Sequence, residues 1–490
     1  MPTTPSERSL RPHRPRSPRR SRRSRRLAAR VACWALLAGA LPACSLVGGD
    51  EDPATSAEAS GPPAAADVVA GLRRALERRA DAVRRGDRRA FAAGLARRTP
   101  QVREQQLTWF DNLAQLPLAE LGYAFDRQNI VRRGDAYWVV VEQSMQLAGY
   151  DDQPVVSHDR FLFRPAPRNE RRMLLASVTD DAWEDEHDVR PQPWDLGPVQ
   201  VRGGLGVLGV FDAGSVGSAA GVIASVERGI ADVSAALPEP WRRTVVVYAL
   251  SSTQFLQTIE ELPGGDPERL DGVAFPVAAG PGQAAAAATR FALHPRMLAR
   301  SGPQRDRLVR HELVHVALGE RDDEAPVWLS EGIAEYVSVR PVDPADRVVA
   351  EAALGRAVEG VDGLPVGESF TAAGDAPVAS YGLSWWVCEY VAGSFGEEAL
   401  WALLDAFGSP GADEDEVLTR VLGLTADQLA DRAARLMVAT FVPGAGPGSG
   451  PEVGDQDPGA PSGEPSGVSS PSPSAPARPS SSALRRRSAS

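Results

Sequence analysis

The five residues from His311 to His315, which read His-Glu-Leu-Val-His, carry the most specific chemistry in the chain. On a helix, residues four positions apart lie one above the other on the same face. The imidazoles of His311 and His315 can therefore converge on one metal ion, and Glu312 lies beside them, where it could take a proton from a water molecule. Histidine is scarce, with 6 in 490 residues, so this spacing rarely arises by chance. The motif predicts a zinc site with an adjacent general base.

A third protein ligand is expected nearby, because catalytic zinc sites use three. Residues 328–336 read Trp-Leu-Ser-Glu-Gly-Ile-Ala-Glu-Tyr. Together with the preceding motif, this segment resembles the gluzincins, the zinc peptidases that include thermolysin and a large aminopeptidase family. The resemblance implies that Glu331 completes the metal site with the two histidines, that Glu312 is the catalytic base, and that Glu335 orients a ligand histidine.

Two departures from the gluzincin pattern narrow the expected activity. The spacing from His315 to Glu331 is shorter than in thermolysin, and the exopeptidase signature GxMEN is absent. The second departure argues against an aminopeptidase. Gluzincins also supply a Tyr or His that donates to the oxyanion, and Tyr381 is the candidate here. A packed aromatic in the core is an equally good interpretation of Tyr381, and His294 is the alternative donor.

Local signals predict two helices that present these residues. The first runs from about residue 304 to 318, with a cap and an early proline in Ser301-Gly302-Pro303 and Gly319 after its last apolar turn. The second begins at Pro326 and ends near Arg340, before a further proline. Its two glutamates share one face within an apolar run, so at least one is expected to be buried and to need a partner or a metal.

The N-terminus predicts an export signal. Eleven arginines in the first 30 residues precede the apolar stretch Val31–Leu41, which is too short to span a bilayer comfortably. Leu41-Pro42-Ala43-Cys44 resembles the bacterial lipobox, which implies a lipidated Cys44 and a location at the outer face of the cell membrane. Ordinary cleavage after Ala43 is the alternative.

The net charge and the cysteine content agree with an exported protein. The chain carries a net charge of −11, and removal of residues 1–43 takes away eleven arginines and one glutamate, which leaves about −21. This acidity argues against nucleic-acid binding and limits membrane contact to the lipid anchor. With Cys33 removed and Cys44 lipidated, only Cys388 remains, so the mature chain has no intramolecular disulfide.

Composition shifts divide the chain into five parts. They are a signal peptide (1–43), a flexible linker (44–66), two folded domains (67–194 and 195–442), and a Pro/Ser/Gly-rich tail (443–490) that is expected to be disordered.

The first folded domain begins with amphipathic helices and continues with strand-like runs at 120–130, 137–147, 155–163 and 173–178. This order indicates an α+β fold and resembles NTF2-like domains. The second domain is expected to have strands at 207–211, 244–250 and 287–293, with helices at 215–237 and 252–261, before its helical half. Strands followed by helices is the gluzincin order.

The leading hypothesis is a cell-surface zinc endopeptidase that acts on a peptide or protein substrate. The substrate is expected to lie extended along residues 287–293, which precede the metal helix. A non-catalytic surface lipoprotein that binds through its NTF2-like domain is the alternative, and intact Glu312 favours the enzyme. Cleavage of a non-peptide amide fits the same residues. The sequence leaves the oligomeric state open.

Overall fold

The computed structural model describes residues 64–442, apart from 188, 260, 261, 282, 284 and 301. The predicted signal peptide, Cys44, most of the linker and the tail lie outside the described residues. All described residues belong to one compact unit. No helix in this part of the chain is long and apolar enough to cross a membrane.

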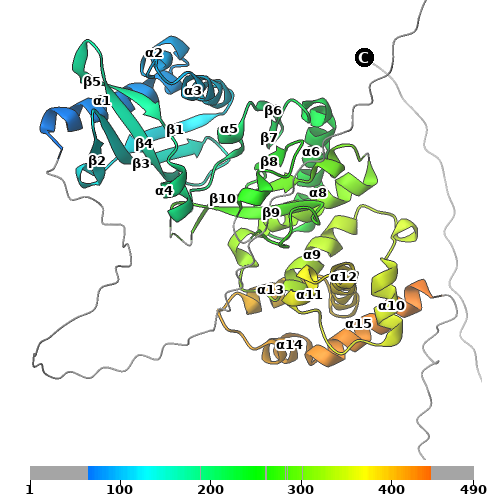
Figure 1. The fold of residues 1–490 in the computed structure, drawn as a ribbon. Helices are drawn as coiled ribbons and strands as arrows, with labels where there is room; N and C mark the ends of the chain where they lie inside the picture. Colours follow the sequence, from blue (N-terminus) through cyan, green and yellow to red (C-terminus); the bar gives the residue numbers. More distant parts are fainter. Residues whose placement is uncertain are drawn as a thin grey trace, which may run out of the picture. The chain divides into compact units, whose positions relative to one another are not determined.

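The N-terminal region places three helices before an antiparallel sheet (Figure 1). The helices are α1 (Ala66–Arg84), α2 (Arg88–Ala93) and α3 (Pro100–Leu113), and the strands are β1 (Leu118–Ala124), β2 (Ile130–Arg133), β3 (Ala136–Leu147), β4 (Val155–Ala166) and β5 (Asn169–Ser177). The sheet order is β1-β3-β4-β5, and β2 pairs with β3. The strand predicted at 120–130 is divided into β1 and β2 by a 3₁₀ turn at Arg127–Asn129 that Asp126 caps. The α+β class is confirmed, and the NTF2-like identity stays a prediction.

Two short helices, α4 (Asp181–Glu186) and α5 (Pro193–Leu196), lead to a second five-stranded sheet. Its strands are β6 (Gln200–Gly204), β7 (Val207–Phe211), β8 (Val245–Ala249), β9 (Gly272–Ala278) and β10 (Ala286–Leu293), in the order β6-β7-β8-β10-β9. Strands β7, β8 and β10 run parallel, and β6 and β9 are antiparallel edges. The sequence predicted neither edge strand. The helix predicted at 252–261 is wrong over its described residues, which form only a 3₁₀ turn at Leu256–Thr258.

Both faces of the second sheet are buried at β7 and β8, which explains why these two strands are apolar throughout. Alternate residues of β8 enter different cores, because successive side chains point to opposite faces. Val245 and Val247 pack with helix α6 (Ala219–Ala236), whereas Val246 and Tyr248 pack in a cluster that also holds residues of the N-terminal sheet. The N-terminal region therefore covers one face of the second sheet.

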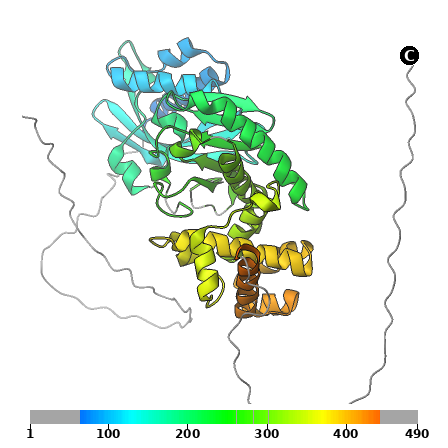
Figure 2. The same ribbon diagram turned by 90° about the vertical axis from the view of Figure 1, so that its right-hand side faces the viewer.

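The rest of the described chain is helical. It comprises α7 (Pro295–Leu298), α8 (Pro303–Leu318), α9 (Val327–Val339), α10 (Glu351–Glu359), α11 (Gly367–Thr371), α12 (Ala376–Phe395), α13 (Glu398–Phe407), α14 (Glu414–Leu422) and α15 (Ala426–Phe441). Helices α8 and α9 match the two predicted helices closely. The N-cap of α8 is Gly302, which offers no side-chain cap. In two views, α10 to α15 gather on the side of α9 away from the sheet (Figure 1, Figure 2).

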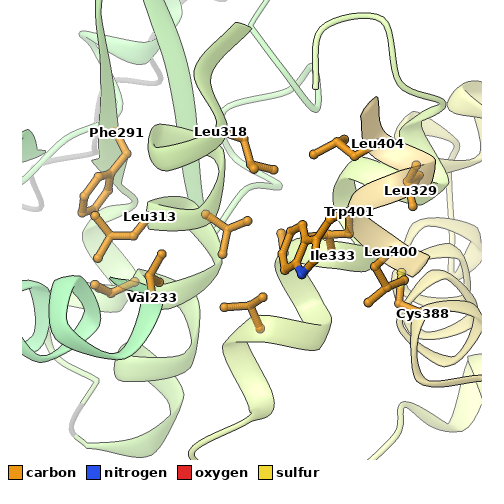
Figure 3. Packing of buried hydrophobic residues seen from close by; sticks show 14 of the residues in the cluster. Val233, Phe291, Leu313, Leu318, Leu329, Ile333, Cys388, Leu400, Trp401 and Leu404 are labelled. Atoms are coloured by element: carbon orange, nitrogen blue, oxygen red, sulfur yellow. The ribbon is translucent and has the colours of Figure 1, made fainter. Parts of the chain in front are cut away.

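One continuous core fixes α8 and α9 between the sheet and the other helices (Figure 3). Leu313 of α8 packs with Phe291 of β10 and Val233 of α6, and all three are at most 2% exposed. On the other side, Ile333 of α9 packs beside Trp401 of α13. Because these contacts lie on both sides of the helix pair, they set the position of every residue that α8 and α9 present between them.

Candidate metal centre

The His-Glu-Leu-Val-His motif lies in helix α8, and its charged side chains are buried and therefore need partners. His311 is 8% exposed and Glu312 is 4% exposed. The apolar face of α8 packs closely on α6, because a side chain at Gly229 would come within 2.7 Å of Leu313 and 3.1 Å of Val309. This close approach directs the opposite face of α8, with the two histidines, toward α9.

Helix α9 presents Glu331 to the histidines through an equally close contact on its other side. A Cβ atom at Gly332 would lie 2.6 Å from the Ser384 carbonyl oxygen and 2.7 Å from the Cys388 sulfur, both in α12. The glycine of the Glu-Gly pair thus lets α12 support α9 directly behind the site. Trp328 contributes to the same support, since its indole N–H donates to Glu414 at 2.6 Å.

The structure brings His311, His315 and Glu331 together with their donor atoms facing one another. The two Nε2 atoms lie 3.3 Å apart. Glu331 Oε2 lies 3.1 Å from Nε2 of His311 and 3.5 Å from Nε2 of His315. A tetrahedral zinc ion with bonds of about 2.0–2.1 Å separates its ligand atoms by roughly 3.3 Å. The three donor atoms therefore have the chemistry and the spacing of a zinc site, and they are the set of residues that could hold a metal in the described part of the chain.

Each histidine also contacts a carboxylate through its other ring nitrogen. Glu335 Oε1 lies 3.2 Å from Nδ1 of His311, and its Oε2 is paired with Arg307. Asp322 Oδ2 lies 3.2 Å from Nδ1 of His315 and accepts a 2.6 Å hydrogen bond from the Ser330 hydroxyl. Such contacts fix the ring orientation and turn Nε2 toward a metal. Glu335 lies against His311, as the resemblance implied, and its role in orienting a metal ligand stays a prediction. Asp322 was not predicted.

The electrostatics of the cluster favour a cation between the donor atoms. Burial alone would lower the pKa of His311, but Glu331 and Glu335 outweigh it and raise the pKa to about 9. Burial likewise opposes ionisation of Glu331, yet His315 and His311 hold its pKa well below the usual range. The carboxylates that would keep protons on these rings would equally stabilise a divalent ion in their place.

Glu312 lies beside the donor set and not within it. Burial raises its pKa, while the histidines and a hydrogen bond from the Ala274 backbone N–H act in the opposite direction. Gly272 makes room for this carboxylate, because a Cβ atom there would lie 2.9 Å from Glu312 Oε1. The glutamate is thus held against strand β9, free of the metal ligands and close to them.

Tyr381 of α12 also reaches the cluster. Its ring lies edge-to-face with His311 at 6.1 Å and with Phe370 at 5.1 Å between centroids. Burial raises the pKa of its hydroxyl, and the nearby Glu331 and Glu312 raise it further, so the phenol keeps its proton as a donor. His294, the alternative donor, instead caps α7 by accepting the Arg296 N–H at 3.1 Å.

A cleft of about 470 Å³ opens over the donor set, and we call it the metal cleft. Residues of β9, both histidines, Glu312, Phe370 and Tyr381 line it. The prediction that a substrate lies along 287–293 is wrong about the strand, because β10 is flanked on both sides and β9 is the edge. Pro276 fits this position, since proline is tolerated in a sheet where its nitrogen faces away from the neighbouring strand.

Residues 299–439 match the family model of the Peptidase MA superfamily. The match begins just before α8 and ends in α15, so it covers the metal-ligand candidates, Glu312, Tyr381 and the helical region. It indicates a gluzincin-like peptidase family over these residues. No curated protein matches the chain.

Proposed function

We propose that this protein is a zinc-dependent endopeptidase. The observation that carries the proposal is the spacing of 3.1–3.5 Å among the donor atoms of His311, His315 and Glu331, with Glu312 beside them in an open cleft. The match to the Peptidase MA superfamily over residues 299–439 supports the same reaction class. Two histidines and one glutamate leave an open position on a zinc ion, as in catalytic sites.

When bound, zinc would polarise the scissile carbonyl and lower the pKa of a coordinated water to roughly 7. Glu312 would then take the proton of the attacking water and return it to the departing amine. Its hydrogen bond from Ala274 ties this carboxylate to the strand edge along which a peptide would pair. Strand β9 would thereby fix the position of the Glu312 carboxylate relative to the substrate backbone.

Tyr381 is the proposed donor to the developing oxyanion. It lines the metal cleft, its phenol keeps its proton, and its ring lies against a ligand histidine. A donor placed there acts only once negative charge forms on the carbonyl oxygen.

Attack on internal bonds is supported by space on both sides of Glu312. The metal cleft continues past Gly272, His311 and Glu312 into a second hollow that Arg300 and Val378 line. A site for chain ends only would need a group that grips a free terminus on one side. Together with the missing GxMEN signature, the open geometry favours an endopeptidase.

The test is incubation of the zinc-loaded protein with a mixed peptide library, with cleavage products identified by mass spectrometry. We expect cleavage at internal bonds that a zinc chelator abolishes and added zinc restores. Absence of cleavage by a protein that carries one zinc per chain would contradict the peptidase assignment and favour a scaffold or another amide substrate.

We further propose that Cys44 anchors the protein at the outer face of the cell membrane, on the strength of the N-terminal arginines, the apolar core and Leu-Pro-Ala-Cys. Replacing Cys44 with Ser should release the protein into the medium or leave it unprocessed. Normal processing with unchanged membrane retention would rule out the lipid anchor.

A further inference from the structure

A second cavity of about 740 Å³ adjoins the metal cleft, and we call it the distal groove. The two share Ala286 and Thr289 of β10 and Gly319 and Glu320 after α8 as lining residues. A chain that leaves the metal cleft past the end of β9 would therefore enter the distal groove. The two hollows form one continuous path.

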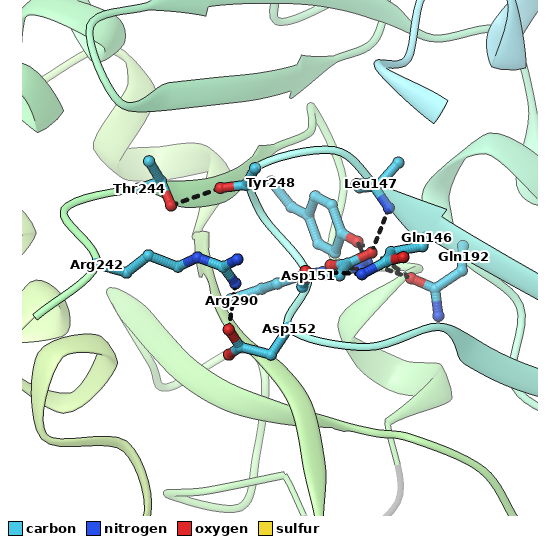
Figure 4. Close-up of polar contacts among 10 residues, drawn as sticks. Gln146, Leu147, Asp151, Asp152, Gln192, Arg242, Thr244, Tyr248 and Arg290 are labelled. Atoms are coloured by element: carbon cyan, nitrogen blue, oxygen red, sulfur yellow. Dashed lines mark hydrogen bonds and ion pairs between the residues drawn. The ribbon is translucent and has the colours of Figure 1, made fainter. Parts of the chain in front are cut away.

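One wall of the distal groove comes from the N-terminal region. Tyr150 and Asp152 lie in the loop between β3 and β4, and both line the groove. This loop is bound to the second sheet along its length. Thr244 donates to the Gly149 carbonyl at 2.7 Å, and the Asp152 N–H donates to the Ala287 carbonyl at 2.7 Å. Arg242 forms an ion pair with Asp152 (Figure 4).

A buried ion pair fixes the centre of the loop. Asp151 and Arg290 of β10 lie 2.7 Å apart, and their side chains are only 1% and 2% exposed. Arg290 also donates to the Tyr248 hydroxyl at 2.6 Å, and Asp151 accepts the Leu147 N–H at 2.7 Å (Figure 4). Buried charges are costly unless fully satisfied, and loss of one partner exposes that cost. The network therefore holds Tyr150 and Asp152 in fixed positions over the groove.

The opposite wall is also organised in advance. Arg321 lies between Glu239 at 3.1 Å and Asp405 at 2.6 Å, so three separate elements meet there. Trp241 is held by a 3.0 Å hydrogen bond from its indole N–H to Ser234. Both Arg321 and Trp241 line the groove. Rigid aromatic side chains and prearranged charges bind an extended chain with little loss of side-chain entropy.

We propose that the distal groove binds a further segment of the same polypeptide substrate, so that the N-terminal region takes part in substrate recognition. This inference rests on the proposed peptidase function. Glu312 is hydrogen-bonded to Ala274 of β9. Ala278 at the end of β9 pairs with Ala286, which lines both hollows. A substrate strand that pairs along β9 therefore needs roughly five residues to reach from the scissile bond to the groove. Substrates extended by that length on one side of the scissile bond gain contacts with Tyr150 that shorter ones lack.

The test is a peptide series built on the best cleaved library sequence and lengthened separately at each end. We expect kcat/KM to rise on lengthening at one end by about tenfold, the effect of one well-packed aromatic contact. In Tyr150→Ala the advantage of the long peptide over the short one should fall by a similar factor. Tyr137→Ala, which changes a tyrosine of the adjoining strand β3 outside the groove, should keep the full advantage.

A second measurement does not depend on variants of the groove. A long peptide with a benzophenone at its far end is bound to full-length zinc-loaded Glu312→Gln protein and cross-linked. Labelling of segments 149–152 or 241–244 supports the proposal. Labelling confined to residues 264–271 or 374–381, on the other side of the metal cleft, overturns it.

The two proposals fail in different ways. Cleavage that shows no one-sided dependence on peptide length, or an advantage that Tyr150→Ala leaves intact, overturns the distal groove alone. Absence of any cleavage by the zinc-loaded protein overturns the peptidase function and this inference with it.

Discussion

At the scale of single residues, the histidine pair follows from local spacing and the two glutamates from the family resemblance, whereas Asp322, the acid at the ring of His315, does not follow from either. His311 and His315 are adjacent on a helix whatever the fold, so sequence places them. Asp322 belongs to an acidic run after α8, and only the turn that follows the helix brings it to His315. A ligand histidine needs an acceptor for its second nitrogen. Because His315 needs such an acceptor, the acidic residues that follow α8 in the sequence were the candidates for this contact.

The roles of Glu331 and Glu335 can be separated by metal analysis. Glu331 contacts both Nε2 atoms, whereas Glu335 contacts only Nδ1 of His311. Glu331→Ala should therefore abolish stoichiometric zinc, and Glu335→Ala should weaken zinc affinity by about 10–100-fold. Zinc affinities from competition with a chelator check this order, and the reverse order would exchange the two roles.

Tyr381→Phe tests the oxyanion donor. The phenol would act only in the transition state, so its loss should reduce kcat and kcat/KM together with little change in KM. We expect a cost of about 2–4 kcal/mol in transition-state stabilisation. Steady-state kinetics of Tyr381→Phe and wild type on a library-derived peptide measure these constants. An unchanged kcat would assign Tyr381 to packing alone.

At the scale of elements, the two helices of the site, α8 and α9, were predictable, whereas β6 and β9, the edge strands of the second sheet, were not. Proline at the start and glycine or proline at the end mark α8 and α9 in the sequence. Strand β9 contains Pro276 and begins with Gly272, two residues that argue against a strand. Its position depends on pairing with β10 and on the contact with Glu312, which are distant in sequence. The sequence therefore predicted substrate pairing along β10, which the structure places inside the sheet.

Gly332→Ala tests whether α12 positions Glu331 by direct packing. The added methyl would meet the Ser384 carbonyl and the Cys388 sulfur at less than 3 Å. Overpacking of this kind costs about 1–3 kcal/mol. Gly393→Ala in α12 is the matched control, because nothing lies within 4 Å of its Cβ position, and it should be neutral or stabilising by up to about 1 kcal/mol. Denaturant unfolding measures the stability of both variants. A Gly332→Ala protein as stable as wild type would contradict the packing role of Gly332.

At the scale of the whole molecule, the N-terminal region is joined to the second sheet by a shared apolar core and by the Asp151–Arg290 pair. Sequence composition suggested two successive domains and could not show this junction, because Asp151 and Arg290 are 139 residues apart in the sequence. The α+β class was predictable from the order of elements. The position of the N-terminal region over the distal groove could not be predicted from the sequence.

The N-terminal region should also make stability depend on pH. Burial and the neighbouring Asp195 raise the pKa of Asp159 to about 7. The unfolded chain loses this proton near pH 4, whereas the folded state keeps it until about pH 7. The free energy of unfolding therefore falls as pH rises through this window, by at most about 4 kcal/mol for a pKa that rises from about 4 to about 7.

Asp159→Asn removes this dependence. The variant should equal wild type in stability near pH 4 and exceed it above pH 7, as measured by urea unfolding of the zinc-free protein. Asp135→Asn, at an exposed site in the same region, is the control and should show no such gap. A difference in the free energy of unfolding between Asp159→Asn and wild type that does not change with pH would contradict the titration of Asp159 proposed above.

We propose that Glu312 moves the proton for hydrolysis at a zinc ion held by His311, His315 and Glu331. The most direct test is the cleavage rate of Glu312→Gln at full zinc occupancy, because the amide keeps the shape of the side chain but cannot accept a proton. We predict one zinc per chain, unchanged folding and a rate about 10²–10⁴-fold below wild type. A zinc-loaded Glu312→Gln protein that cleaves peptides as fast as wild type would contradict the mechanism.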